Sequence, residues 1–397
     1  MITVQKAQEL IDNEKSVPKQ KKVPLTKTLG ENLAEEVFAE RNQPPFDRVA
    51  MDGIALSFQA WKEKKVDSFP IKGIQAAGVP ALKLEDSKSC IEVMTGSTLP
   101  VGCDCVVPYE QISLKQGTAT LEKGLEIIQG QNIHQKGSDY KEGDLLLEKG
   151  KKINSPLMGV LASEGRTQVT IEEALNVAIV STGDELVPIQ ETPLSHQIRL
   201  SNPHALKAEL KRSLQKDVDI FHLKDDPKDI FSALEDIIEK YQVVIITGGV
   251  SKGKYDYVPS VLADLGVKEI FHKVKQRPGK PFWFGKKADG PHIFGLPGNP
   301  VSCLVCLRRY VVPFLKNSKE SPQKVVLQED FSFNKNLTLF MPVTVQGNVN
   351  GKLEASLKKT NGSGDYYSLA KSDGFIELPQ EKNKFFQGET FSFYPWS

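Results

Sequence analysis

The apolar residues in the middle of the chain fall into short continuous runs, and each run leads into a loop rich in glycine, proline, hydroxyls or acids. The clearest runs are 177–180, 243–246 and 292–294, with helical patterns between them. Uniformly apolar strands that alternate with helices are typical of a mostly parallel sheet covered on both faces. Residues 175–318 are therefore predicted to form a three-layer α/β domain.

The same periodicity predicts the other elements of this domain. Further strands are expected at 218–223, 268–275 and 282–284, and helices at 203–215, 230–238, 258–265 and 301–315. The last helix carries Cys303 and Cys306 in a C-x-x-C pattern. Because the run around them is apolar and no second Cys or His pair completes a zinc site, both are expected to pack in the core.

On both sides of this domain the pattern is of β type. Short runs at 91–95, 106–108, 118–121 and 125–128, separated by turn residues, predict a β domain over 46–136. Helical patterns at 4–11 and after 155 flank it, so it is predicted to be inserted into a discontinuous linker domain of residues 1–45 and 137–174. Runs at 325–327, 353–357, 375–378 and 391–393 predict a barrel-like β domain over 319–397. The fold class is thus multidomain α/β plus all-β.

Composition narrows the classes of function. The 397 residues carry a formal net charge of +1, which gives no electrostatic reason to expect nucleic acid or an anionic membrane as a partner. The start lacks an apolar signal region, and no run is long enough to span a bilayer. A cytoplasmic protein is expected, and its five cysteines do not describe a disulfide framework.

Acids and hydroxyls follow two of the predicted strands. Open α/β sheets bind ligands at the carboxyl ends of their strands, and carboxylates there suit a Mg²⁺ ion that bridges phosphates. The alternative is that Asp184 caps a turn and Glu185 is solvated. Asp225 and Asp226 stand before Pro227, so one of them is either a helix N-cap or an acid on the same edge. The first of these loops comprises Ser181, Thr182, Gly183, Asp184 and Glu185.

Three further loops have the residue types of an anion site. Gly248 and Gly249, with Ser251 and Asp256 after them, can form a nest of backbone N–H groups, or else a tight turn. Four cations around Pro278-Gly279 can grip an oxyanion, or else form a solvated hairpin. The loop that opens the last helix offers free N–H groups. The cations are Lys273, Lys275, Arg277 and Lys280, and the helix-opening residues are Pro297, Gly298, Asn299 and Pro300.

In their order, these motifs resemble the MoeA family of molybdopterin molybdenumtransferases and the homologous C-terminal domain of gephyrin, over nearly the whole chain. Each motif is weak alone, but the ordered set is specific. Besides the loops above, it includes Pro45-Phe46-Asp47, Met51-Asp52-Gly53, Met94-Thr95-Gly96, Gly137-Ser138-Asp139 and Asp256-Tyr257.

The resemblance implies a homodimer with a shared active site that inserts molybdate into adenylylated molybdopterin, a pterin substrate, and releases AMP with Mg²⁺. It also implies a transient contact with the molybdopterin adenylyltransferase. Asp52, Thr95 and Asp139 would come from the partner subunit. By the same resemblance, Glu185, Asp225 and Asp256 would hold Mg²⁺ or the pyrophosphate, and Lys273, Arg277, Pro297, Pro300 and Ser363 would bind molybdate or the pterin phosphate.

Two positions depart from the family pattern. His134 stands where the family usually has Arg, with Lys136 available to supply the charge, and Arg277 stands where many members have Lys. Two rival functions remain. A molybdopterin adenylyltransferase shares the α/β domain but usually lacks the flanking domains. A gephyrin-like scaffold would leave the acidic motifs without a purpose.

Overall fold

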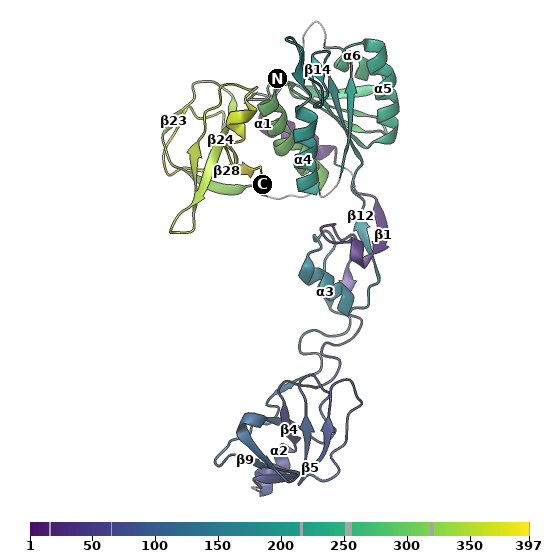
Figure 1. The fold of residues 1–397 in the computed structure, drawn as a ribbon, viewed down its shortest axis with the longest axis vertical. Helices are drawn as coiled ribbons and strands as arrows, with labels where there is room; N and C mark the ends of the chain where they lie inside the picture. Colours follow the sequence, from purple (N-terminus) through teal and green to yellow (C-terminus); the bar gives the residue numbers. More distant parts are fainter. Residues whose placement is uncertain (16, 65, 215–216, 251–255, 318–320, 397) are drawn as a thin grey trace. The chain divides into compact units, whose positions relative to one another are not determined.

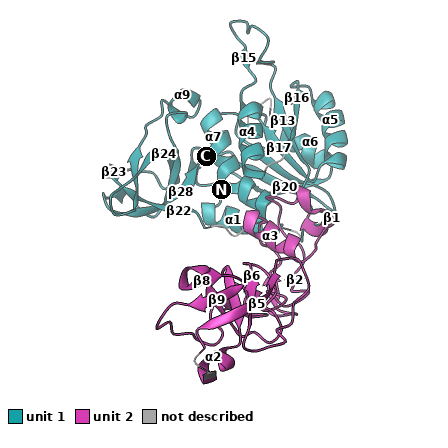
Figure 2. Cartoon of the chain, turned by 60° about the horizontal axis from the view of Figure 1, so that its bottom comes forward, with its two compact units in different colours: residues 1–19, 173–397 teal, residues 20–172 magenta. Residues whose placement is uncertain are grey.

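The computed structural model describes residues 1–15, 17–64, 66–214, 217–250, 256–317 and 321–396. The chain forms two compact units, residues 1–19 with 173–397 (unit 1) and residues 20–172 (unit 2), shown in teal and magenta in Figure 2. Strands β1 (Gln20–Pro24) and β12 (Gln168–Glu172) pair antiparallel where the chain enters and leaves unit 2. No helix in the described ranges combines the length and the apolar character that crossing a membrane requires.

A six-stranded sheet in the order β16-β13-β17-β21-β20-β18 forms the centre of unit 1. The first four strands are parallel to one another, which confirms the predicted sheet type, whereas β20 runs antiparallel to both of its neighbours, β21 and the edge strand β18. The strands are β13 (Val177–Thr182), β16 (Asp219–Leu223), β17 (Val243–Thr247), β18 (Val267–His272), β20 (Trp283–Lys287) and β21 (His292–Leu296).

Helices cover both faces of this sheet, as Figure 1 shows. Successive residues of β13 point to opposite faces, so Ala178 and Val180 pack with α5 and α6, while Val177 and Ile179 pack with α4 and α7. Both sets are buried, which explains why the strand is apolar at every position. The three layers are thus confirmed, with helices α4 (Asn202–Leu214), α5 (Pro227–Lys240), α6 (Val258–Asp264) and α7 (Pro300–Cys306).

The N-terminal helix α1 (Val4–Asn13) belongs to the α/β core. Its N-cap is Thr3, as the sequence suggests, and Thr3 Oγ1 accepts from the N–H of Lys6 at 3.1 Å. Val4, Ala7 and Ile11 are buried in the same cluster as the sheet. Residues 1–19 therefore pack in unit 1 rather than with 137–174, where the predicted division of the chain had grouped them. The other predicted boundaries stay a prediction.

The last helix of the α/β domain is less regular than the single helix expected at 301–315. After α7 the chain makes a π-helical turn, η3 (Leu307–Val311), and ends in α8 (Val312–Lys316). Cys303 and Cys306 are completely buried here, and burial raises the pKa of the Cys303 thiol to about 12. Their predicted role in core packing is confirmed.

The C-terminal residues form a closed barrel, which confirms the barrel-like domain. Its strand order is β24-β25-β22-β28-β26, and the pairing of β24 with β26 closes it. A short strand of the α/β domain, β19 (Gln276–Arg277), adds to β24 in parallel. The barrel contains β22 (Gln323–Leu327), β24 (Thr338–Gly347), β25 (Leu353–Leu357), β26 (Gly374–Leu378) and β28 (Thr390–Pro395), with β23 (Phe331–Ser332), β27 (Lys384–Phe385) and α9 (Tyr366–Leu369) beside them.

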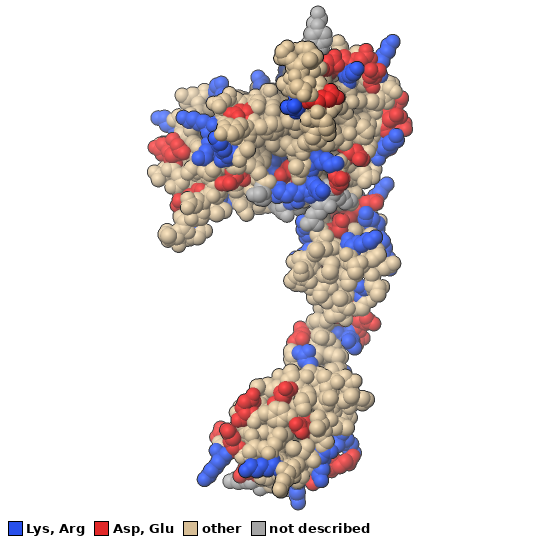
Figure 3. Space-filling view, viewed as in Figure 1, with Lys and Arg blue, Asp and Glu red and all other residues tan. Residues whose placement is uncertain are grey.

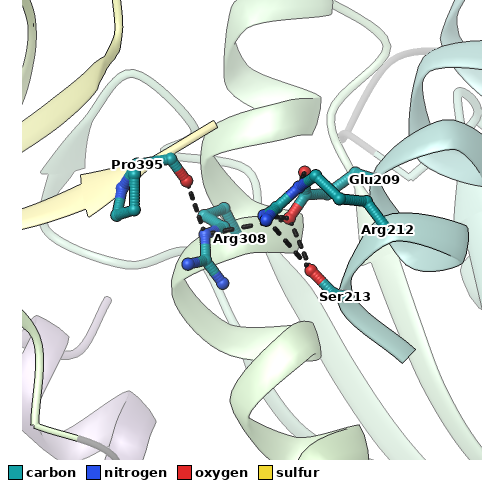
Figure 4. A network of polar contacts seen from close by, with 5 residues as sticks. All are labelled: Glu209, Arg212, Ser213, Arg308 and Pro395. Carbon is teal, nitrogen blue, oxygen red and sulfur yellow. Dashed lines mark hydrogen bonds and ion pairs between the residues drawn. The ribbon is translucent and has the colours of Figure 1, made fainter. Parts of the chain in front are cut away.

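Two consecutive arginines on η3 make polar contacts between the α/β domain and this barrel. Arg308 Nε donates to the carbonyl of Pro395 at 2.8 Å and lies 3.7 Å from Glu209, whose buried carboxylate also accepts from Arg212 and Ser213 (Figure 4). Arg309 Nε donates to Glu377 of β26 at 2.7 Å. Both guanidiniums thus make hydrogen bonds across the joint between the two domains of unit 1, and the bond to Glu377 is charge-assisted.

Unit 2 contains a six-stranded sheet in the order β7-β4-β6-β5-β9-β8 and a smaller core around α3. The strand expected at 125–128 is wrong, because this segment has no ladder partner and runs as a loop. The elements are η1 (Leu25–Lys27), β2 (Val37–Phe38), β3 (Arg48–Val49), β4 (Gly53–Leu56), α2 (Phe58–Lys64), β5 (Ser68–Gln75), β6 (Cys90–Val93), β7 (Cys105–Pro108), η2 (Tyr109–Gln111), β8 (Ile112–Lys115), β9 (Thr118–Leu121), β10 (Ile133–His134), β11 (Leu145–Leu147) and α3 (Ser155–Ser163), and unit 1 adds the strand pair β14 (Leu186–Val187) and β15 (Ile198–Arg199).

Candidate active site

The loops singled out in the sequence meet at the carboxyl edge of the parallel strands. Thr182 is in register with Leu223 on one side, and Ser181 with Thr247 on the other, while Thr247 is in turn level with Leu296. Four strand ends thus lie level, and the loops that follow them are adjacent. Ser181 itself is buried and donates to the carbonyl of Phe221 at 3.2 Å, so its hydroxyl is used within the sheet.

Four acidic residues influence one another at this edge. Burial raises the pKa of Asp225, and the charges of Asp184, Glu185 and Asp256 add to the effect. The N–H of Asp225 donates to Asp184 Oδ1 at 3.2 Å, which ties the two loops together. These four residues are called the acidic edge below. Carboxylates that gather in this way favour a cation among them.

Two details explain why the acidic edge has this composition. Asp226 is the N-cap of α5 and accepts from two backbone N–H groups, so the alternative left open for the Asp pair is resolved and Asp225 is the residue at the edge. Gly183 has φ of 141°, and a Cβ there would lie 2.7 Å from Glu185 Oε2. The positive φ favours glycine here, and a larger residue would also displace the Glu185 carboxylate from its place over the loop.

The Gly248-Gly249 loop crosses the end of β13 at close range. Both glycines have positive φ, and a Cβ on either would lie 2.7 Å from an oxygen of Thr182. Thr182 Oγ1 is buried and makes no hydrogen bond within the described part of the chain. A buried hydroxyl without a partner is unusual, and this one lies directly beneath the backbone of the Gly248-Gly249 loop. Ser251 lies outside the described residues.

Asn202, which the sequence did not single out, links the ends of two of these strands to helix α9 beside the barrel. Its Nδ2 donates to the carbonyl of Gly298 at 2.6 Å and approaches Thr247 Oγ1 at 3.3 Å, and its Oδ1 accepts from Tyr366 at 2.9 Å. Gly298 also lies against Gly248, since a Cβ on Gly298 would be 3.7 Å from the Gly248 Cα. The loops after β17 and β21 are therefore in contact.

A cleft of about 900 Å³ opens between the α/β domain and the barrel. Four cations line it, two from each domain, and its lining contains no Asp or Glu. We call it the basic cleft; Figure 3 shows Lys and Arg side chains gathered over the barrel. Such a cavity favours an anion. Its polar lining includes Gln276, Arg277, Lys280, Asn299, Ser302, Lys335, Lys359, Thr360, Asn361 and Ser363.

Only some of the residues predicted to bind an oxyanion line the basic cleft. Arg277, Lys280, Asn299 and Ser363 line the basic cleft, whereas Lys273, Lys275, Pro297, Gly298 and Pro300 do not. The expected free N–H groups at the start of α7 need a correction, because the N–H of Val301 already donates to the Ser363 carbonyl at 2.9 Å. That bond brings the Ser363 loop of the barrel to the cleft.

Three predicted site residues lie in unit 2. Asp52 Oδ1 accepts from the N–H and the hydroxyl of Thr95, at 2.6 and 2.7 Å, and these bonds lower the pKa of Asp52. Asp139 accepts from His134 Nε2 at 2.9 Å. Each of the two carboxylates is thus held by a donor of its own unit.

Metal binding by the chain alone is not supported by geometry. Within the ranges that the structure describes, no three His, Cys, Asp or Glu side chains stand close enough together to hold a metal ion. The oxygen donors of the acidic edge nevertheless fit Mg²⁺, which typically takes one or two carboxylates and completes its shell with phosphate oxygens and water. A substrate phosphate would have to supply the remaining ligands.

Comparisons with known proteins cover the whole of this arrangement. The family descriptions "MoeA N-terminal region (domain I and II)", "Probable molybdopterin binding domain" and "MoeA C-terminal region (domain IV)" match residues 2–165, 178–317 and 324–396. A protein of Synechocystis named molybdopterin molybdenumtransferase is 40% identical over 92% of this chain and 93% of its own length. One of Staphylococcus aureus with the same name is 32% identical over 98% and 94%.

Solved structures agree with the sequence comparisons. A molybdopterin biosynthesis MoeA protein of Pyrococcus horikoshii superposes with a TM-score of 0.83 at 28% identity, covering 100% of this chain and 99% of its own. The similarity thus extends over the α/β domain, the barrel and unit 2. The chain belongs to the MoeA family of molybdopterin molybdenumtransferases, enzymes of molybdenum cofactor biosynthesis.

Proposed function

We propose that this protein inserts molybdate into adenylylated molybdopterin and releases AMP, with Mg²⁺ required. The observation that carries the proposal is the pairing of the acidic edge with the basic cleft through the loops after β17 and β21. The phosphoanhydride of the substrate needs carboxylates that hold its Mg²⁺, and molybdate needs a site lined by cations. The relatives named above support the pterin and molybdate as substrates.

Each loop has a distinct task in this proposal. Glu185, Asp225 and Asp256 hold Mg²⁺, which when bound neutralises the phosphates and favours cleavage of the anhydride. The amides of Gly248 and Gly249 and the hydroxyl of Thr182 bind phosphate oxygens. Arg277 and Lys280 hold the molybdate, and the planar guanidinium of Arg277 can donate two parallel hydrogen bonds to it.

We propose that unit 2 contributes to the active site of a second copy of the chain. Asp52, Thr95 and Asp139 would enter the site of the partner subunit in a homodimer, and the protein would act in the cytoplasm. A transient contact with the adenylyltransferase would deliver the substrate. A molybdopterin adenylyltransferase itself is the weaker reading, because the family match continues through unit 2 and the barrel.

AMP release tests the proposal directly. Adenylylated molybdopterin is incubated with Mg²⁺, with and without molybdate, and AMP is quantified for wild type, Glu185→Gln and the control Glu191→Gln from the exposed loop that follows. We expect molybdate-stimulated release that only Glu185→Gln abolishes. No release by the wild type from intact substrate would refute the transferase and favour the gephyrin-like scaffold.

A further inference from the structure

A histidine in unit 2 lies between an arginine and one of the predicted catalytic acids. Strand β3 pairs antiparallel with β10, and His134 is directly opposite Arg48. Arg48 Nη2 is 2.9 Å from His134 Nδ1, and His134 Nε2 is 2.9 Å from Asp139 Oδ1. The three side chains form a continuous line of hydrogen bonds from the strand pair to the carboxylate.

The chemistry of the two partners fixes the state of the imidazole. A guanidinium has only donors, so His134 Nδ1 must accept and cannot carry a proton. The ring proton is then on Nε2, where it is donated to Asp139. The neutral Nε2–H tautomer satisfies both contacts, whereas a doubly protonated ring would point an N–H at the Arg48 N–H.

Hydrogen bonds fix the backbone around Asp139, so the direction of its carboxylate depends mainly on its side-chain torsions. The N–H of Asp139 donates to the Gln43 carbonyl at 2.9 Å, and that of Gly137 donates to the Pro44 carbonyl at 2.9 Å. The Lys136 N–H donates to Asp47 Oδ1 at 2.8 Å. His134 therefore supplies the contact that decides where the carboxylate points. Asp139 is 42% exposed, so its second oxygen can still meet a ligand.

We propose that His134 is a positioning residue: as a neutral Nε2–H imidazole anchored by Arg48, it orients Asp139 for the reaction. This inference rests on the proposed function, in which Asp139 enters the active site. The charged groups around the ring are Arg48 on β3 and Asp139, with Asp47 and Lys136 next to them in the chain. Protonation of the ring would place a donor at Nδ1 opposite the Arg48 donor and break that contact. We therefore expect the protonated form of His134 to be less active.

Two variants of His134 separate positioning from mere packing. In His134→Gln the amide oxygen can accept from Arg48 and the amide nitrogen can donate to Asp139, without a titrating group. His134→Phe keeps a ring but loses both contacts. The control is His196→Gln, an exposed histidine of unit 1. Each is assayed for AMP release between pH 5.5 and 8.5, with kcat and KM determined separately.

We expect His134→Phe to lower kcat by roughly 10- to 100-fold with little change in KM, as a displaced catalytic group does. His134→Gln should keep most of the activity at neutral pH and lose the acid limb of the wild-type profile. If His134→Gln has the same pH profile as the wild type, or is as inactive as His134→Phe, the proposal is wrong.

A measurement without substrate tests the geometry independently. In ¹⁵N-histidine-labelled protein at neutral pH, the His134 signals should show a protonated Nε2 and an unprotonated Nδ1, and His134→Gln identifies these signals by their loss. A Nδ1–H tautomer or a charged ring would overturn the proposal. If the tautomer is as expected but the wild type releases no AMP, the proposed function fails, and the positioning role fails with it.

Discussion

The acidic edge and the basic cleft differ in both charge and construction. The acidic edge comes from loops of one domain, after β13, β16 and β17, and burial together with its charges raises the pKa of Asp225. The basic cleft is built by two domains, with Arg277 and Lys280 on one wall and Lys335 and Lys359 on the other. One region repels anions and the other attracts them.

Each region gathers charges of one sign. Like charges that lie close together repel one another, and a fold tolerates them where a ligand of opposite charge completes the site. The joint between the domains shows the contrary case, since Arg309 is nearly buried but is paired with Glu377 at 2.7 Å. We therefore assign the gathered charges of one sign to ligand binding and the buried ion pair to the joint between the domains.

The largest effect is expected from the acidic edge. Glu185→Gln removes a metal ligand, so the rate of AMP release at saturating molybdate should fall by about 100-fold or more, because a bound metal contributes several kcal/mol to the transition state. Molybdate affinity, measured by calorimetry, should be unchanged. Equal losses in rate and affinity would contradict a division of labour between the two regions.

A smaller effect, on molybdate affinity instead of rate, is expected from a change in the basic cleft. Arg277→Ala should weaken molybdate binding roughly 10-fold, since a charge-assisted hydrogen bond in an exposed setting contributes about 1.5 kcal/mol. The Mg²⁺ concentration for half-maximal AMP release should stay the same. Lys275→Ala is the matched control, because Lys275 is close in sequence but does not line the cleft; a similar loss in both variants would argue against Arg277 as a molybdate ligand.

The barrel's contribution should be weaker again. Lys335→Ala and Lys359→Ala should each reduce molybdate affinity about two- to fivefold, as single exposed charges do, and the loss should shrink at high salt. Lys352→Ala, an exposed lysine of the barrel outside the cleft, serves as the control. Wild-type affinity in the double variant Lys335→Ala, Lys359→Ala would confine the site to the α/β domain.

The smallest effect concerns stability and pH. An unfolded Asp has a pKa of about 3.9 and the folded pKa of Asp225 is raised, so the folded state holds the extra proton between these values. Stability therefore falls as pH rises through this window, and Asp225→Asn should melt a few degrees higher at pH 7 and equal the wild type near pH 3. Differential scanning calorimetry measures both, and a destabilised variant at pH 7 would show that Asp225 is not strained by its neighbours.

The sequence was informative where one local pattern decides the structure. Apolar runs predicted β13, β17 and β21, and the loops after them were correctly placed on one edge because parallel strands end together. By contrast, β24 was missed although it has 10 residues, since Pro342 interrupts it and proline usually argues against a central strand. Its backbone is nevertheless paired with β26 through this position.

Long-range packing was the part that no local pattern could supply. The apolar face of α1 was recognised, but a helical face does not name its partner, and it packs on the α/β sheet. Lys335 and Lys359 were not singled out, because the cleft exists only once the barrel is docked beside Arg277. Asn202 was missed for the same reason, since its three partners lie far away in sequence.

The molybdate dependence of AMP release is the most direct test of the two-region account. Initial rates are measured over a range of molybdate concentrations at saturating Mg²⁺ for wild type, Glu185→Gln and Arg277→Ala. We predict that Glu185→Gln lowers the maximal rate without moving the half-saturating molybdate concentration, and that Arg277→Ala raises this concentration with the maximal rate nearly kept. A shift of the same parameter by both variants would contradict the account.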